Sequence, residues 1–177
     1  MPVPDALSNN DAALQEDIEH HKDELRAWLR LFASTTLIEN EIRSRLREQF
    51  NFTLPRFDML SQLDRCPDGL VLGDISRRLM VTAGNVTAVC EKLIYDGYIT
   101  RTASPTDRRV QIVRMTHAGR AAFAIMAEAH ATWVTEFFDE LDATDLENLN
   151  RILRKLKNSA QSRTSKSRTG MPEKAEI

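Results

Sequence analysis

The chain lacks long apolar runs and contains little cysteine. No segment of its 177 residues approaches the roughly 18 consecutive apolar residues that a membrane-spanning helix requires. Its acidic N-terminal segment differs from the positively charged start of a secretory signal peptide. The two cysteines, Cys66 and Cys90, have no CxxC spacing, which argues against a disulfide framework and a structural zinc site. We therefore expect a protein of the reducing cytoplasm.

Motifs of catalysis are also missing. The sequence has no Gly-rich phosphate-binding loop, no nucleophile elbow and no HExxH motif. The four histidines show no metal-ligand spacing. Carboxylates are plentiful, but they alternate with Lys and Arg as on a solvated helix surface. We predict that the protein is not an enzyme, has no catalytic residues and uses no metal or other cofactor.

The small net charge of −2 hides a segregation of charge along the chain. Residues 1–24 hold seven acidic groups and one lysine, whereas residues 74–120 hold eight basic groups against four acidic ones. Residues 151–168 contain seven basic residues and no acidic one. The basic segments favour contact with a polyanion, and the acidic N-terminus opposes it. A pI near 6.1 is too low for composition alone to indicate nucleic-acid binding.

Glycine and proline are absent from Asp11 to Gln49, which permits one or two unusually long helices. Further helices are predicted from Pro55 to about the CPDG sequence, from Thr116 to about Leu141, and after the DATD sequence. Apolar residues at i+3 and i+4 spacing mark the last of these: Leu146, Leu149, Ile152, Leu153 and Leu156.

The middle of the chain has the pattern of a helix-turn-helix motif. Ile75 and Leu79 predict a short helix of about two turns, followed by a break at Met80–Val81. Thr82 is a good N-cap for a second helix, and Gly97 stands where a left-handed C-terminal cap belongs. The buried stripe of this second helix is predicted to comprise Val86, Val89, Cys90, Leu93 and Ile94.

A basic hairpin follows at once. The segments YITRTA and RRVQIVRM have β-branched, alternating patterns, and SPTD supplies a turn between them. The predicted fold is therefore mainly α with a small β-hairpin wing. In this arrangement the second helix enters a major groove of DNA and the wing arginine reaches a minor groove. Asp107 is expected to orient the guanidinium of Arg109 by a charge-assisted bond. The expected DNA-contacting residues are Arg77, Arg78, Thr82, Ala83, Gly84, Asn85, Thr87, Asp107, Arg108 and Arg109.

These motifs resemble those of the multiple antibiotic resistance regulator (MarR) family over roughly residues 20–160. The resemblance is carried by Ile75 and Leu79, the Val86–Thr87 pair, Leu93, the DGYITR helix exit, the D-x-R wing of Asp107 and Arg109, and MTHAG at the next helix. Met115 departs from the leucine that is more usual there. The resemblance implies a homodimeric transcription regulator, usually a repressor, that binds a pseudo-palindromic operator and is released by a small ligand.

The resulting organisation combines a central DNA-binding domain with flanking helices that dimerise. The apolar excess of the last helix supports dimerisation independently, although packing within one chain is an alternative. The predicted divisions are a flexible N-terminus (1–10), a helical dimerisation region (11–52 and 117–160), a winged helix-turn-helix domain (53–116) and a disordered basic tail (161–177).

An effector pocket is implied by the resemblance, between the first long helix, the second helix and the DNA-binding lobe. The candidate ligand residues are His21, Trp28, Phe32, Thr36, Arg56 and Phe57, with core packing as the alternative for the aromatic ones. We interpret Glu39 and Arg43 as an i,i+4 pair on a partly exposed helix face. Part of the sequence is similar to relatives associated with aromatic-acid catabolism, so the expected effector is an aromatic carboxylate or its CoA thioester.

Two other functions are compatible with the sequence. One is a redox-sensing regulator acting through Cys66 or Cys90, which would need an accessible thiol of low pKa. The other is a winged-helix module that binds protein. Loss of DNA affinity on removal of the wing arginine separates the DNA-binding reading from the second alternative.

Overall fold

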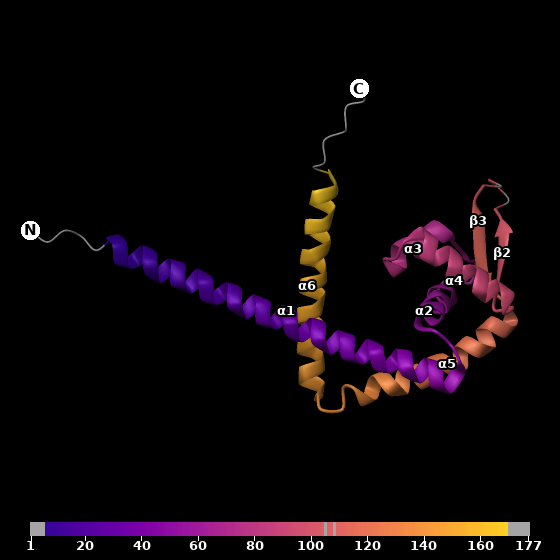
Figure 1. Cartoon of the computed structure of the whole chain (residues 1–177), viewed down its shortest axis with the longest axis horizontal. Helices are drawn as coiled ribbons and strands as arrows, with labels where there is room; N and C mark the ends of the chain where they lie inside the picture. The colour runs from indigo at the N-terminus through magenta and orange to yellow at the C-terminus, as the bar shows by residue number, and fades with distance from the viewer. Residues whose placement is uncertain (1–5, 105, 108, 170–177) are drawn as a thin grey trace, which may run out of the picture. The chain divides into compact units, whose positions relative to one another are not determined.

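The computed structural model describes the backbone of residues 6–104, 106, 107 and 109–169, and the side chains of those among them from 22 to 164. This part of the chain is mainly helical with one small sheet, which confirms the predicted fold class (Figure 1). It divides into two compact units, one ending at Trp133 and the other beginning at Val134. No helix among these residues is sufficiently long and apolar to cross a membrane.

Helix α1 (Ala6–Phe50) is a single helix of 45 residues. The stretch without Gly or Pro allows it to propagate, because each added residue contributes one further backbone hydrogen bond. Residues 6–10 are therefore helical, whereas we expected a flexible segment over 1–10. The helix ends at Asn51, which has a φ of 49°, a left-handed conformation that Asn tolerates better than most residues.

Helices α2 (Leu54–Asp64), α3 (Leu72–Leu79) and α4 (Ala83–Tyr95) form a lobe in which α3 and α4 are the predicted helix-turn-helix (Figure 1). The short turn between them begins at Met80, whose φ of 55° is left-handed. The Ser76 hydroxyl donates a hydrogen bond to the Val81 carbonyl at 2.6 Å across this turn. The tight turn and the shared core beneath it fix α4 relative to α3.

Both predicted caps of α4 are confirmed. The Thr82 hydroxyl accepts a hydrogen bond from a backbone N–H of the first turn at 3.4 Å. At the other end, Gly97 has a φ of 77°, and its N–H donates a hydrogen bond to the Ile94 carbonyl at 3.0 Å. The Tyr98 N–H bonds the Leu93 carbonyl at 2.9 Å, which completes a Schellman motif. The DGY sequence thus ends the helix and starts the wing.

The sheet contains strands β1 (Leu70–Val71), β2 (Ile99–Ala103) and β3 (Gln111–Met115), antiparallel in the order β1–β3–β2. Strands β2 and β3 are the predicted hairpin. Strand β1 was not predicted, because two residues are too few to show an alternating pattern. Leu70 pairs with Val113 and both are buried, so this short strand ties the start of α3 to the base of the wing.

The apolar core of the first unit joins α1, α2, α3, α4, the sheet and the part of α5 (His117–Glu136) up to Trp133. Val86, Cys90 and Leu93 of the predicted α4 stripe are buried, while Val89 and Ile94 are half-buried. Further fully buried side chains are Leu46, Met59, Leu60, Leu63, Ile75, Ile99 and Val113. This burial leaves the opposite side of α4 in solvent.

The junction of wing and α5 depends on Thr116 and Gly119. The Thr116 hydroxyl donates to the Gly97 carbonyl at 2.8 Å and accepts the Gly119 N–H at 2.9 Å. The Thr116 hydroxyl therefore caps α5 and, through its second hydrogen bond, holds the residue that follows the end of α4. A Cβ atom on Gly119 would lie 2.0 Å from the Tyr98 carbonyl oxygen, so glycine is required there by close packing.

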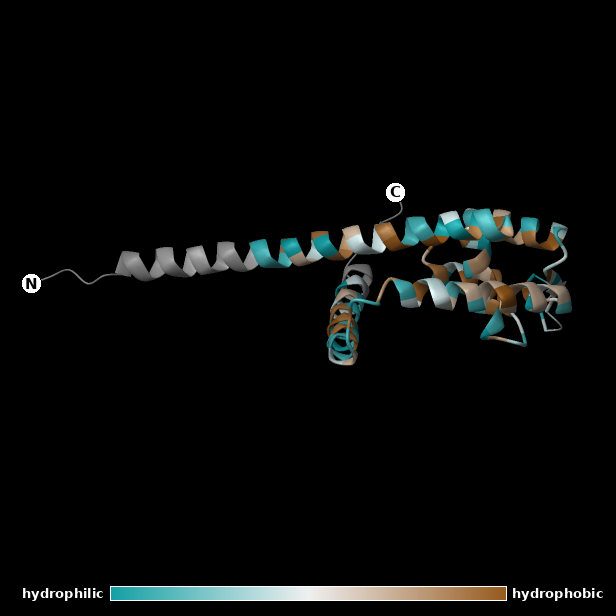
Figure 2. Cartoon of the chain, turned by 90° about the horizontal axis from the view of Figure 1, so that it is seen from below, coloured by the Kyte–Doolittle hydropathy of each residue, from teal (hydrophilic) through white to brown (hydrophobic). Residues whose placement is uncertain are grey.

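In the second unit, helix α6 (Ala143–Thr169) begins where the Asp142 carboxylate accepts the Asp145 N–H at 2.8 Å. Helix α6 carries both hydrophobic and hydrophilic residues (Figure 2), and Ile152, Leu153 and Leu156 are 52%, 38% and 49% exposed. We expected a disordered tail over residues 161–177. Residues 161–169 continue helix α6, and residues 170–177 lie outside the described residues.

Replacing Gly119 tests the packing at the junction. We expect Gly119→Ala to lower the free energy of unfolding by more than about 2 kcal/mol, because the methyl group forces the Tyr98 backbone to move. Gly73→Ala on α3 is the matched control: a Cβ there meets no atom within 4 Å, so alanine should stabilise by up to about 1 kcal/mol. Urea unfolding measures both. Equal effects of the two substitutions would contradict the role of Gly119.

Candidate nucleic-acid interface and adjoining cavity

The leading turn of α4 is polar and uncrowded. Thr82, Ala83, Gly84 and Asn85 are exposed, as the DNA-contact prediction requires. A Cβ on Gly84 would have no neighbour within 4 Å, so the backbone here is open to close approach. Thr87 differs from the others, because it is half-buried and its hydroxyl donates to the Ala83 carbonyl at 3.0 Å. Its side chain is therefore partly committed to the helix.

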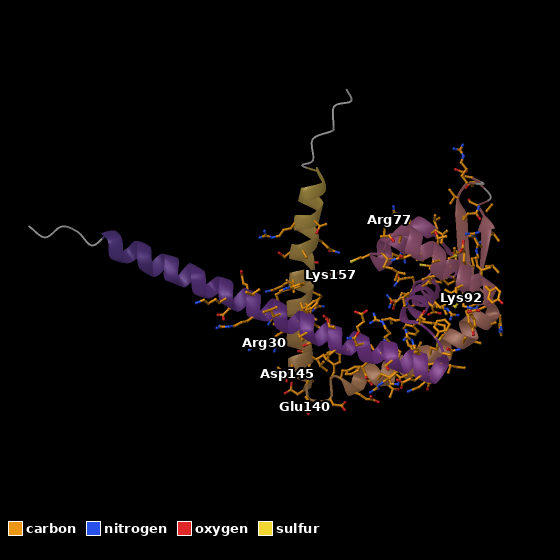
Figure 3. All side chains as sticks on the ribbon, viewed as in Figure 1. Arg30, Arg77, Lys92, Glu140, Asp145 and Lys157 are labelled. Atoms are coloured by element: carbon orange, nitrogen blue, oxygen red, sulfur yellow. The ribbon has the colours of Figure 1, made fainter. Side chains whose placement is uncertain are left out.

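Two cations of α3 lie next to this turn in the chain. The side chain of Arg77 is 80% exposed and pairs with Asp74 one turn earlier; Figure 3 labels it on α3. Arg78 is also exposed, and one of its guanidinium nitrogens lies 3.4 Å from the Cys66 sulfur. A solvent-exposed ion pair between residues three apart on a helix contributes little free energy. The Arg77 guanidinium can therefore leave Asp74 and bind a phosphate.

The wing tip carries a predicted contact that is almost fully exposed. The Arg109 side chain is 96% exposed. The Asp107 carboxylate accepts the Arg109 backbone N–H at 2.9 Å, whereas the guanidinium Nε lies 4.0 Å away. Asp107 thus forms an ion pair with the guanidinium at the limit of ion-pairing distance, and its hydrogen bond goes to the backbone N–H, which shapes the turn. Arg108 lies outside the described residues.

A buried cation anchors the C-terminal end of α4. Arg56 of α2 is 9% exposed and forms an ion pair with Asp96, which Lys92 also bonds at 3.0 Å; Figure 3 labels Lys92 on α4. The guanidinium stacks over the Phe52 ring at 4.0 Å from its centroid. Its Nε is buried with no hydrogen-bond partner among the described atoms. Arg56 therefore joins α2 to α4, which is a structural role.

A cavity of about 810 Å³ lies between α1, α2, the α3–α4 motif and α5. Apolar side chains form most of its wall, among them Ile38, Ile42, Met59, Val86 and Val89. The polar lining consists of Thr35, Glu39, Arg43, Asp58, Asn85 and His130. A mostly apolar cavity with a few polar groups is typical of sites for small organic molecules.

None of the predicted ligand residues with described side chains lines this cavity. Trp28 and Phe32 are each 57% exposed on α1, with ring centroids 5.9 Å apart. Phe57 is buried against Phe123 at 5.4 Å. Thr36 is half-buried outside the lining, Arg56 has the anchoring role above, and the side chain of His21 lies outside the described residues. The aromatic candidates therefore either pack in the core, as Phe57 does, or lie on the surface of α1, as Trp28 and Phe32 do.

The polar lining was missed because its members look like surface residues in the sequence. Glu39 and Arg43 do form the i,i+4 ion pair that we interpreted as an exposed surface feature, and their side chains are 55% and 42% exposed. The same pair nevertheless borders the cavity. Asp58 carried no sequence signal at all, since a single acidic residue on a helix is ordinary. Only the packing of α2 against α1 turns it toward the cavity.

The cavity perturbs two titratable groups. Burial, with a further contribution from Glu39, raises the pKa of Asp58 from 3.8 to about 6, although Arg43 acts in the opposite direction. Burial lowers the pKa of His130 below its ordinary value, and its ring stacks on Phe57 with centroids 4.9 Å apart. Near neutral pH the cavity therefore contains an ionised Asp58 and an uncharged imidazole.

Cys90 does not have the character of a redox sensor. Cys90 is fully buried, and burial raises its pKa, so the reactive thiolate is disfavoured. Cys66 is half-buried beside Arg78. Among the described residues, no cluster of three or more His, Cys, Asp or Glu side chains is arranged to hold a metal ion.

The polar leading turn of α4, the cations of α3 and the arginine wing together define a winged helix-turn-helix protein. Residues 50–110 match the sequence model of the MarR family. YkoM of Bacillus subtilis, named as an uncharacterized HTH-type transcriptional regulator, is 30% identical over 142 residues, which are 80% of this chain and 88% of that protein.

Solved structures agree with this match. A MarR family regulator from Silicibacter pomeroyi is 28% identical with a TM-score of 0.69, over 80% of this chain and 97% of that chain. Sco3205, a MarR family regulator from Streptomyces coelicolor crystallised with DNA, shares the fold at 20% identity with a TM-score of 0.71, over 78% of this chain and 88% of that chain. The chain belongs to the MarR family of DNA-binding transcriptional regulators, and it is not an enzyme.

Asp58 provides a stability test of the cavity. Because its folded-state pKa of about 6 exceeds the ordinary 3.8, the folded chain binds more protons than the unfolded chain between these values, and stability falls as pH rises through them. Asp58→Asn should raise the free energy of unfolding at pH 8 by about 1–2 kcal/mol, a value reduced for partial solvent screening. The gain should shrink as pH falls toward 4.

The matched control is Asp64→Asn, at the exposed end of the same helix. It should change stability little at either pH. Urea unfolding at several pH values measures both variants. If Asp58→Asn raised the free energy of unfolding equally at every pH, or lowered it at pH 8, burial of the ionised Asp58 carboxylate would not be the cause.

Proposed function

We propose that the protein is a homodimeric, ligand-responsive repressor that acts in the cytoplasm, where its pseudo-palindromic operator lies. The observation that carries this proposal is the exposed polar turn Thr82–Asn85 of α4, with exposed arginines on α3 and on the wing of the same unit. A helix entering a major groove presents its N-terminal side chains to base edges. Arg77 and Arg78 then contact phosphates, and Arg109 enters the minor groove.

Dimerisation is supported by apolar surface on the flanking helices. On α1, Leu25, Trp28, Leu29 and Phe32 are all more than half exposed, and α6 exposes Ile152, Leu153 and Leu156. Surfaces of this kind commonly mark protein interfaces. We propose that residues 11–52 and 117–160 pair with a second copy, while residues 53–116 bind DNA. The two α4 helices would then lie about one DNA turn, roughly 34 Å, apart.

Ligand response is supported by the position of the cavity beside the DNA-reading helix. Asn85, Val86 and Val89 belong to α4 and also line the cavity. A bound molecule would therefore contact the helix whose placement determines operator binding. Release of the operator requires that the molecule prefer a dimer shape with another spacing of the α4 helices, because equal affinity for both shapes would shift no population. The family resemblance implies an aromatic carboxylate or CoA thioester as effector.

The wing arginine tests the DNA-binding proposal. Arg109→Ala should weaken operator binding by at least about 1 kcal/mol, because the variant loses the minor-groove contact. Fluorescence anisotropy with the native upstream region measures the affinity. Arg26→Ala, at an exposed arginine on α1, is the control and should have little effect. Unchanged affinity of Arg109→Ala would favour the alternative of a protein-binding winged helix.

Asn85 tests base reading separately from affinity. If its amide bonds a base edge, Asn85→Ala should reduce discrimination against the wrong base at one operator position by about 1–3 kcal/mol. Selection of bound DNA from random pools, for the wild type and the variant, reports the preference at each position. An equal loss across all sequences would show that Asn85 contacts only the DNA backbone.

A further inference from the structure

We propose that the cavity between α1, α2, the α3–α4 motif and α5 binds an organic cation, with Asp58 as its counter-ion and the apolar wall receiving its hydrocarbon part. This inference rests on the proposed ligand response and names the chemical class of the effector. It replaces the aromatic carboxylate or CoA thioester that the family resemblance implies.

The charges that line the cavity favour a cation. Glu39 and Asp58 supply two carboxylates against the single guanidinium of Arg43. Arg43 already forms an ion pair with Glu39 and bonds the Asn40 side chain at 2.9 Å. A carboxylate or phosphate entering the cavity would have to compete with Glu39 for this guanidinium and would lie among two like charges.

Asp58 is the group that a cation would satisfy. Within the described part of the chain, no group donates a hydrogen bond to its carboxylate, which borders a wall of Ile42, Leu54 and Met59. An ionised carboxylate in partly apolar surroundings is disfavoured until an opposite charge joins it. A ligand ammonium or amidinium group would supply both the opposite charge and the N–H donors.

The remaining polar groups are compatible with a cation. His130 faces the cavity from α5, and burial lowers its pKa, so it is uncharged near neutral pH and adds no positive repulsion. The residues contributed by α3, α4 and the turn between them carry no charge: Leu79, Val81, Asn85, Val86, Ala88 and Val89. The charges around Asp58 are therefore those of Glu39 and Arg43 on α1.

The volume suits a drug-sized organic molecule rather than a metal ion or a small inorganic cation. About 810 Å³ lies within the range of roughly 300–1,000 Å³ that such ligands occupy. Two or three fused rings with a short cationic arm would place hydrocarbon against Ile38 and Val89 while the arm reaches Asp58. The same molecule would contact Asn85, which the proposed function assigns to DNA.

Three probes with one apolar body and different charge test the proposal on the full chain. They are naphthylmethylamine, naphthalenemethanol and naphthoate, measured by titration calorimetry at pH 7.5, with benzoyl-CoA as the representative of the thioester class. We expect the amine to bind at least about tenfold more tightly than the alcohol, as one partly buried charge pair allows, and naphthoate and benzoyl-CoA to bind most weakly. Tighter binding of naphthoate or benzoyl-CoA, or no binding of the amine, would overturn the proposal.

Variants identify the counter-ion. Asp58→Asn should reduce the preference for the amine over the alcohol by about tenfold, while Asp64→Asn on the same helix should preserve it. In the wild type, amine affinity should fall as pH is lowered through about 6, where Asp58 becomes protonated, and the fall should be smaller in Asp58→Asn. A preference that survives in Asp58→Asn would contradict the role of this carboxylate.

Operator binding by the same preparations, measured without any probe, separates this inference from the proposed function. Selective binding of the amine by a protein that does not bind its upstream DNA would refute the proposal that the protein is a repressor, but not the cation site. Operator binding without selectivity for the amine would refute the cation site, but not the repressor proposal.

Discussion

The burial of one face of α4 is the constraint on which the DNA-binding surface depends. Val86, Cys90 and Leu93 are at most 2% exposed, and their burial contributes about 1.5–3 kcal/mol for each large apolar side chain. Because these residues recur at helical spacing, their burial fixes the rotation of α4 about its axis. The first turn is then left in solvent with its polar side chains outward. Rotating the helix to bury Asn85 would expose the core.

Two polar contacts connect this helix to its surroundings at its C-terminal end. The Arg56–Asp96 ion pair joins it to α2, and the Thr116 hydroxyl joins its C-terminal cap to α5. The wing starts at the same cap, so α4 and the wing share one support. The positions of Arg109 and Asn85, which we propose contact DNA, therefore depend on residues outside the proposed DNA-contacting set. This explains why DGY and MTHAG accompany the helix-turn-helix motif in the sequence.

Local features of the fold could be predicted from the sequence, and features that require packing could not. The caps at Thr82 and Gly97, the break at Met80 and the hairpin each follow from nearby residues, and the structure confirms them. The two-residue strand β1 and the continuation of α6 to Thr169 had no such local signal. The cavity lies where the family resemblance implied an effector pocket, but its polar lining was not predicted: Glu39, Arg43 and Asp58 come together only when α2 packs on α1.

We propose that two copies of α4 read successive major grooves on one side of a DNA duplex. Hydroxyl-radical footprinting of the purified protein on its own upstream region is the sharpest test. We expect two protected segments with centres one helical turn apart, arranged symmetrically, with additional minor-groove protection on the flanks from the wings. A single protected segment, or no protection at low salt by a protein that sediments as a monomer, would contradict it.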